Sequence, residues 1–257
     1  MAGQSTAVVW LENGAIKDEG ADVRSRMGWG ALDKDIVLFS EDDDTEYLQS
    51  LIDQWPHLAH RTVIWPCFGV SSIPDGDRLA KLRDRHGVKI MVHRDRDFMS
   101  DADAEAWKAN RNYTANQIPV WFSVGSDIES CFQVAEHISR AMEIDHAVAE
   151  KGLEYALNEL EEAAVSASFN EAYNKAVQPL PGQANAIQRW NDLGGFCQAT
   201  IKGKTFKQAL RRGLQIAVPE AGQARKLGNM RKIYKGNSAA PICEDLSVLL
   251  QGLVDEQ

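Results

Sequence analysis

The sequence predicts an α/β protein in which a mostly parallel sheet is flanked by helices and followed by a helical C-terminal region. Between residues 35 and 138, short apolar runs alternate with amphipathic segments of about ten residues, an order typical of βαβ units. The apolar runs are continuous, as expected for strands that helices cover on both faces. From about residue 133 onward the strand pattern ends, and only helical spacing follows.

The individual elements follow in chain order. We expect strands at residues 35–40, 61–69, 88–93 and 118–124, where Val, Ile, Phe and Trp are concentrated. Helices are expected at residues 43–54 and 75–86, from an N-cap at Ser100 to residue 110, and after Asp127. Beyond the sheet, helical spacing predicts helices at residues 147–177, 181–192, 205–216 and 244–253.

The chain divides into three predicted parts. Residues 1–34 form a loop-rich lead-in, in which residues 6–11 have the pattern of a strand. Residues 35–138 form the sheet domain, and residues 139–257 form a helical domain. The longest apolar runs have about four residues, whereas a membrane-spanning helix needs roughly 20. With no signal-peptide pattern, and with four cysteines that lack CxxC or zinc-site spacing, we expect a cytoplasmic protein with no membrane partner.

Charge is distributed unevenly along the chain. The net charge is −9, and residues 1–150 carry 15 Lys and Arg against 26 Asp and Glu. Residues 198–235, here called the basic segment, carry ten basic residues and one acidic residue, Glu220. A solvated helix face would explain this segment, but so would a surface that binds phosphates. Under the second interpretation the nucleic-acid-binding residues are Lys202, Lys204, Lys207, Arg211, Arg212, Lys226, Arg231 and Lys232.

Acidic residues follow three of the four predicted strands. The run 41–44 follows the first strand, Asp95 and Asp97 follow the third, and Asp127 and Glu129 follow the fourth. Ligands of open parallel sheets bind beyond the carboxyl ends of the strands, so these side chains are expected at one edge. Asp95 and Asp97 are two apart and would project to one side if the chain is extended there. Oxygen ligands without suitably spaced His or Cys favour Mg²⁺ or Mn²⁺ over zinc.

This arrangement resembles the TOPRIM domain, a Rossmann-like fold, and in particular nucleases of the OLD (overcoming lysogenization defect) type. The resemblance covers about residues 35–138, through VLFSEDDDTEYL at 37–48, KIMVHRDRDF at 89–98 and SDIESCF at 126–132. Asp42 stands where TOPRIM proteins usually have Gly. Thr45 stands where OLD nucleases have a second acid, for which Asp44 could substitute. The resemblance implies catalytic residues Glu41, Asp95, Asp97, Glu129 and Lys204, with Lys202 the alternative lysine, and metal ligands Glu41, Asp44, Asp95, Asp97, Asp127 and Glu129.

The resemblance implies an Mg²⁺- or Mn²⁺-dependent endonuclease that hydrolyses phosphodiester bonds in DNA or RNA. Glu41 would be a metal ligand or the general base, and Lys204 would stabilise charge in the transition state. OLD-like nucleases commonly work with an ATPase. This chain has no P-loop motif, so an antiphage defence effector with a separate ATPase partner is expected. A homo-oligomer is left open.

Other interpretations remain open at this point. Asp42 and Thr45 are compatible with a non-catalytic TOPRIM module that serves binding or assembly. A phosphoacceptor receiver domain also has acids after its first and third strands, but it has a single acceptor Asp and a lysine after a fifth strand. A primase or topoisomerase would need a companion domain. His93 precedes the Asp95–Asp97 pair, and its role is left open.

Overall fold

The computed structural model describes residues 11–12, 15–16, 35–178, 180 and 185–255. Most of the predicted lead-in, and residues 181–184 of one predicted helix, therefore lie outside the described residues. Within the lead-in, β1 (Leu11–Glu12) pairs antiparallel with β2 (Ala15–Ile16). Among the described residues, no helix is long and apolar enough to cross a membrane.

Four parallel strands form the central sheet, in the order β4-β3-β5-β6. They are β3 (Ile36–Ser40), β4 (Thr62–Pro66), β5 (Lys89–Arg94) and β6 (Val120–Phe122). The register aligns Ser40 with Pro66 on one side and with His93 on the other, so the strands end side by side. The α/β fold with an all-parallel sheet, flanking helices and a helical C-terminal region is confirmed.

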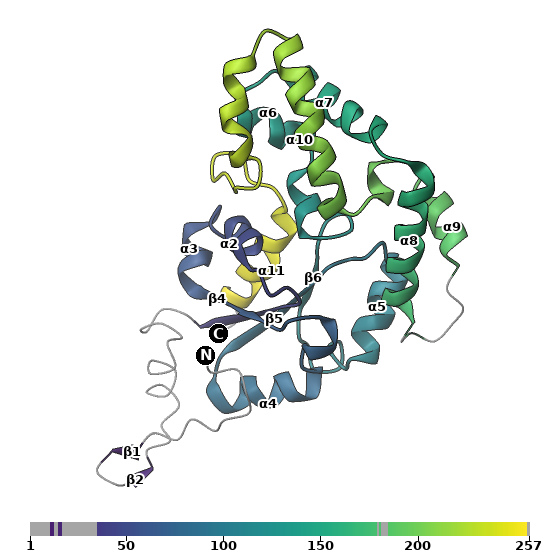
Figure 1. Cartoon of the computed structure of the whole chain (residues 1–257). Coiled ribbons are helices and arrows are strands. Elements are labelled where there is room, and N and C mark those ends of the chain that lie inside the picture. Colours follow the sequence, from purple (N-terminus) through teal and green to yellow (C-terminus); the bar gives the residue numbers. More distant parts are fainter. Residues whose placement is uncertain (1–10, 13–14, 17–34, 179, 181–184, 256–257) are drawn as a thin grey trace.

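Helices cover both faces of the sheet, which explains why the strands are continuous apolar runs. Ile36 and Leu38 of β3 pack with α2 (Glu46–Ile52), α3 (Pro56–Arg61) and α11 (Glu244–Asp255). Val37 and Phe39 point to the opposite face, toward α4 (Gly76–His86) and α5 (Asp101–Asn110). This alternation follows from the two-residue period of a strand. Figure 1 shows the two helical layers on either side of the sheet.

The caps of α4 and α5 agree with the sequence prediction. Asp75 accepts a hydrogen bond from the Arg78 N–H at the start of α4, and Gly87 ends that helix with a left-handed backbone. Ser100 caps α5 through a reciprocal capping box with Asp103, so the predicted N-cap is confirmed.

Three predicted helices differ from the structure. The helix expected at 147–177 is two helices, α7 (His146–Asn158) and α8 (Glu162–Val177). No Pro or Gly marks the break. It arises because α7 packs along α10 (Gly203–Glu220), whereas α8 packs against Phe98 and Met99 near the sheet. The segment after Asp127 is a short 3-10 helix, η2 (Ile128–Phe132), and the first predicted helix begins only at Glu46.

Two groups of helices follow the sheet. In the first, α6 (Ala135–Met142) and α10 pack with α7, and η4 (Ala224–Lys232) contacts both α6 and α10. In the second, α9 (Ala186–Asp192) and η3 (Gln198–Thr200) contact α8. A short 3-10 helix, η1 (Val70–Ser72), follows β4.

The two long helices α7 and α10 pack closely at Gly213, which has no Cβ. A Cβ at this position would lie 2.2 Å from the Gly152 carbonyl oxygen, so the close approach requires glycine. After η4 the chain returns to the sheet, where Asp245 of α11 accepts a hydrogen bond from Trp121 Nε1 at 2.8 Å.

Candidate metal centre

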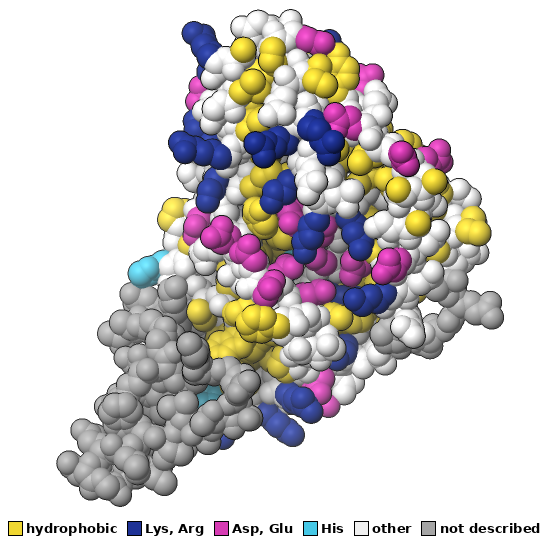
Figure 2. All heavy atoms as spheres, viewed as in Figure 1, with side chains coloured by type: hydrophobic (Ala, Val, Ile, Leu, Met, Phe, Trp, Pro, Cys, Tyr) yellow, Lys and Arg dark blue, Asp and Glu magenta, His cyan; other side chains and the backbone are white. Residues whose placement is uncertain are grey.

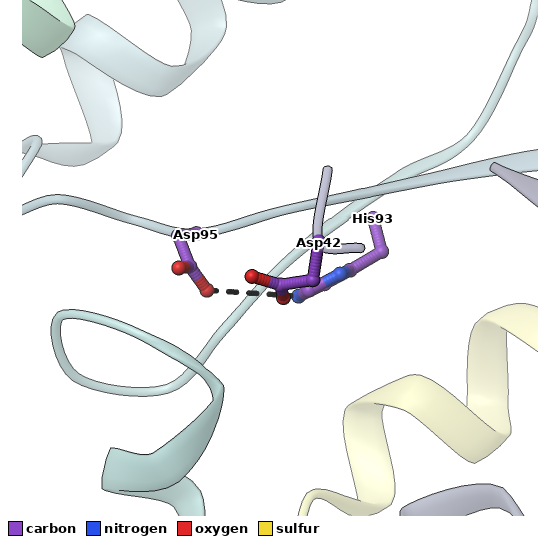
Figure 3. A group of neighbouring side chains, drawn as sticks. All are labelled: Asp42, His93 and Asp95. Carbon is purple, nitrogen blue, oxygen red and sulfur yellow. Dashed lines mark ion pairs between the residues drawn. The ribbon is translucent and has the colours of Figure 1, made fainter. Parts of the chain in front are cut away.

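Carboxylates from three neighbouring strand ends meet at one edge of the sheet. Glu41 and Asp42 follow β3, Asp95 and Asp97 follow β5, and Asp127 and Glu129 follow β6. Oxygen or nitrogen atoms of Asp42, His93 and Asp95 lie within 4.8 Å of one another, and their side chains point toward a common centre (Figure 3). Figure 2 shows acidic side chains in a band across this face, with lysines and arginines beside them.

Burial and crowding disfavour the charged forms of these carboxylates, although Arg94 Nε lies 3.9 Å from Glu41 Oε2 and opposes the rise in the pKa of Glu41. Burial, followed by the charge of Asp97, raises the pKa of Glu41 to about 7. Burial, followed by the charge of Asp127, raises the pKa of Glu129 to about 7 as well. Burial also raises the pKa values of Asp42, Asp95 and Asp97, and neighbouring carboxylates add to each shift. A divalent cation would relieve this repulsion.

Asp95 is held in place through one of its two oxygens. Its Oδ1 accepts a hydrogen bond from the Ser123 hydroxyl at 3.0 Å and another from the Ile128 N–H at 3.0 Å. Its own N–H donates to Glu41 Oε2 at 3.3 Å, which ties the ends of β5 and β3 together. These contacts engage Oδ1, and they point to Oδ2 as the Asp95 oxygen for a ligand.

His93 supports Asp95 through a directed chain of hydrogen bonds. Since the Ser123 hydroxyl donates to Asp95, its oxygen accepts from His93 Nε2 at 2.9 Å. His93 Nδ1 then accepts from the Ser40 hydroxyl at 3.1 Å, and the Ser40 oxygen accepts from the Asp42 N–H at 3.3 Å. Burial lowers the pKa of His93 to about 3, in keeping with a neutral ring. Both ring nitrogens are thus occupied, so His93 orients Asp95 and is not itself an open ligand.

Asp97 reaches the cluster by a turn, and the extended chain expected between Asp95 and Asp97 is wrong. Strand β5 ends at Arg94, and Asp97 has a left-handed backbone at φ 45°. The Asp97 N–H donates to the Ser126 carbonyl at 2.7 Å, which fixes the turn against the loop after β6. Asp97 raises the pKa of Glu41, and Arg94 opposes the rise in the pKa of Asp97.

Asp127 connects two helix starts, and both of its oxygens are engaged. Oδ1 accepts from the Ser130 hydroxyl at 2.8 Å at the start of η2, and Oδ2 accepts from the Lys204 N–H at 3.1 Å at the start of α10. A Cβ at Gly203 would lie 2.1 Å from Asp127 Oδ1, so only glycine permits this approach. Asp127, predicted as a metal ligand, therefore holds α10 against the cluster.

This junction brings Lys204 to the rim of the cluster. Its Nζ lies 3.6 Å from Asp42 Oδ1. Burial by itself would lower the pKa of Lys204. The net effect is a raised pKa, because four carboxylates act on the ammonium group: Asp42, Asp95, Glu129 and Asp127. Lys202, the alternative lysine, occupies the N-cap position of α10 and interacts electrostatically with Asp97. The structure thus brings both candidate lysines to the site.

Glu129 provides the clearest sign that the centre accommodates a further group. The residue is 5% exposed, and its Oε2 is buried without a hydrogen-bond partner within the described part of the chain. A buried carboxylate oxygen without a partner is costly, and such atoms in native proteins call for an explanation such as an ion. The charged groups that act on Glu129 are Asp127, Lys204 and Lys207. Among the described residues, the ligand atoms that lie within 4.8 Å of one another belong to Asp42, His93 and Asp95. Carboxylate oxygens suit Mg²⁺ or Mn²⁺, so the chemistry of Asp42 and Asp95 is compatible with the predicted metal.

Asp44, the substitute predicted for the missing acid at Thr45, is not brought into the cluster. It is exposed, and its carboxylate accepts a hydrogen bond from the Glu46 N–H at 3.0 Å, as at a helix start. Asp42 instead turns toward Asp95 and Lys204. The sequence places Asp42 in the acidic run 41–44 and marks it as a departure from the TOPRIM pattern, but does not single it out as a ligand. Its direction depends on the turn after β3, for which the sequence gives no signal.

The basic segment separates into two groups in the structure. Lys202, Lys204 and Lys207 lie on the first turns of α10, and Lys207 donates to the Tyr47 hydroxyl and lies over the Tyr47 and Tyr234 rings. Further from the cluster, Arg212 pairs with Glu159 at 3.3 Å. Lys226 and Lys232 both pair with Glu143. Arg211 and Arg231 are exposed.

In comparisons with known proteins, no protein-family model, no curated protein and no solved structure matches the chain.

Proposed function

We propose that the carboxylate cluster binds Mg²⁺ or Mn²⁺ and that the protein is a metal-dependent nuclease that hydrolyses phosphodiester bonds. The observation that carries this proposal is the buried Glu129 Oε2, which has no hydrogen-bond partner among the described residues; Glu129 follows β6, the strand next to the one that Asp95 follows. An acidic cluster that served only as helix caps would have its oxygens occupied by N–H groups, as in Asp127.

The metal ligands in this proposal are Glu41, Asp42, Asp95, Asp97 and Glu129. When bound, the metal supplies an activated water and neutralises charge on the leaving oxygen. His93 and Ser123 keep Asp95 oriented, and Asp127 keeps Lys204 at the rim. Lys204 stabilises the charge that develops on the reacting phosphate. Lys202 and the exposed Arg211 contact neighbouring phosphates, which gives affinity without reading base sequence.

The role in antiphage defence with a separate ATPase partner rests on the resemblance to OLD-type nucleases and belongs to the same proposal. An ATPase encoded beside this gene is the expected partner, and its addition with ATP should raise cleavage. DNA and RNA both remain substrates to test.

Cleavage of labelled DNA and RNA with Mg²⁺ or Mn²⁺, and with EDTA as the metal-free reference, tests the proposal. The wild type, alone or with its ATPase, should cut with metal and stop in EDTA. Glu129→Gln and Lys204→Gln should lose most activity, whereas Glu154→Gln, an exposed change on α7, should retain it. Cleavage that persists in EDTA, or that survives Glu129→Gln, would contradict the proposal.

A further inference from the structure

Phe68, just beyond the end of β4, is exposed in a way that packing does not explain. Its exposed fraction is 74%, the largest among the large hydrophobic residues that the structure describes. The residue before it, Cys67, is buried in the core on the α4 side of the sheet. An aromatic ring costs free energy in water, so a well-packed segment that exposes one suggests that the ring has another contact to make.

The backbone holds Phe68 in this orientation at a cost. Its φ is +59°, a left-handed conformation that is rare for a bulky residue, and Gly69 follows at φ +112°. The segment is nevertheless pinned on both sides of the ring. The Cys67 N–H donates to the Ser40 carbonyl at 2.8 Å, and the Gly69 N–H donates to the Glu41 carbonyl at 2.7 Å. Strain maintained by surrounding contacts is typical of functional positions.

These two hydrogen bonds also locate the ring. They join the residues on either side of Phe68 to the last residue of β3 and to Glu41, one of the proposed metal ligands. The backbone of Phe68 therefore lies at the sheet edge on which the carboxylates meet, and its exposed side chain is held beside Glu41. A nucleotide whose phosphate lies at the cluster has its own base, or that of a neighbour, available to contact the ring.

We propose that Phe68 is a stacking surface for a nucleobase, and that the substrate is a single-stranded or locally unpaired nucleic acid. This inference rests on the proposed nuclease function and adds the substrate class. An aromatic side chain stacks on the face of any base, which provides affinity without sequence preference. In a duplex both faces of each base are covered by its neighbours, so an exposed ring gains little from paired DNA or RNA.

Binding of fluorescein-labelled oligonucleotides tests the proposal, in a Glu129→Gln background with Mg²⁺ to suppress cleavage. The probes are a short oligothymidine, an abasic strand of the same length, and a hairpin duplex. Phe68→Leu keeps an apolar side chain at this position but removes the aromatic face. It should weaken oligothymidine binding about 10-fold, the loss expected for one stacked base, and leave abasic-strand and duplex binding unchanged. Phe68→Trp should restore oligothymidine binding.

A matched control and the contrary outcomes complete the experiment. Ile187→Ala removes another exposed hydrophobic side chain, 73% exposed on α9, and should change none of the affinities. Equal binding of oligothymidine by Phe68→Leu and the parent protein, or an equal loss for the abasic strand, would overturn the stacking role. If the wild type still cleaves in a metal-dependent way, only this inference fails. If no probe binds and no substrate is cut, the proposed function fails with it.

Discussion

Replacing Glu41 by Gln should stabilise the metal-free protein at neutral and higher pH. In the folded protein the Glu41 carboxyl is mostly buried among other carboxylates, and its pKa rises from 4.5 to about 7. The folded state therefore holds a proton that the unfolded state releases. Stability is lost as pH rises from about 4.5 to about 7, and the loss is complete above that window. A shift of this size corresponds to roughly 3 kcal/mol.

Guanidinium unfolding in EDTA at several pH values between 4 and 8 measures this effect. The wild type should lose stability across the window, whereas Glu41→Gln should lose less and be the more stable protein at pH 8. Glu154→Gln, an exposed change, should follow the wild type. Mg²⁺ should stabilise the wild type at pH 8 by about 2.7 kcal/mol at 100 times its Kd, and stabilise Glu41→Gln less. Parallel pH profiles for the wild type and Glu41→Gln, or a less stable variant at pH 8, would refute the reasoning.

Three further substitutions separate the roles of individual residues. Gly203→Ala places a Cβ 2.1 Å from Asp127 Oδ1, so α10 must move. The substitution should lower the free energy of unfolding, measured by heat or guanidinium, by about 1–3 kcal/mol, and should sharply reduce cleavage. Ser123→Ala removes a donor to Asp95; titration calorimetry should show about 10-fold weaker Mg²⁺ binding, and unchanged affinity would disprove the positioning role. Asp44→Ala should lower stability by about 1 kcal/mol while metal-dependent cleavage continues; loss of cleavage in a folded variant would return Asp44 to the site.

The sheet could be predicted from sequence because each strand is a continuous apolar run bounded by polar segments. The same pattern predicted that acids after three strands would share one edge. In the structure Glu41, Asp95 and Asp97 interact there, while Glu129 interacts with Asp127 and Lys204. This inference needed only the direction of parallel strands. It did not need the side-chain positions.

The supporting contacts could not be predicted, since they depend on side-chain direction and on distant segments. Nothing in the sequence distinguishes Ser123, which holds Asp95, from an ordinary small polar residue in a strand. Asp127 stays a predicted ligand. Its hydrogen bonds at the starts of η2 and α10, the second of which joins residues 77 positions apart, could not be predicted from the sequence. Gly203 was the available signal, since a glycine between two lysines at a helix start is compatible with close approach.

Binding of Mn²⁺ or Mg²⁺ by titration calorimetry tests the central claim most directly, because it requires neither a substrate nor an ATPase partner. The wild type should show saturable binding at pH 8, and Glu129→Gln and Asp95→Asn should each lose more affinity than Ser123→Ala, because they remove a ligand and not its support. Glu154→Gln should bind as the wild type does. Equal binding by the wild type and Glu129→Gln, or no saturable binding by the wild type, would contradict a metal centre built on these carboxylates.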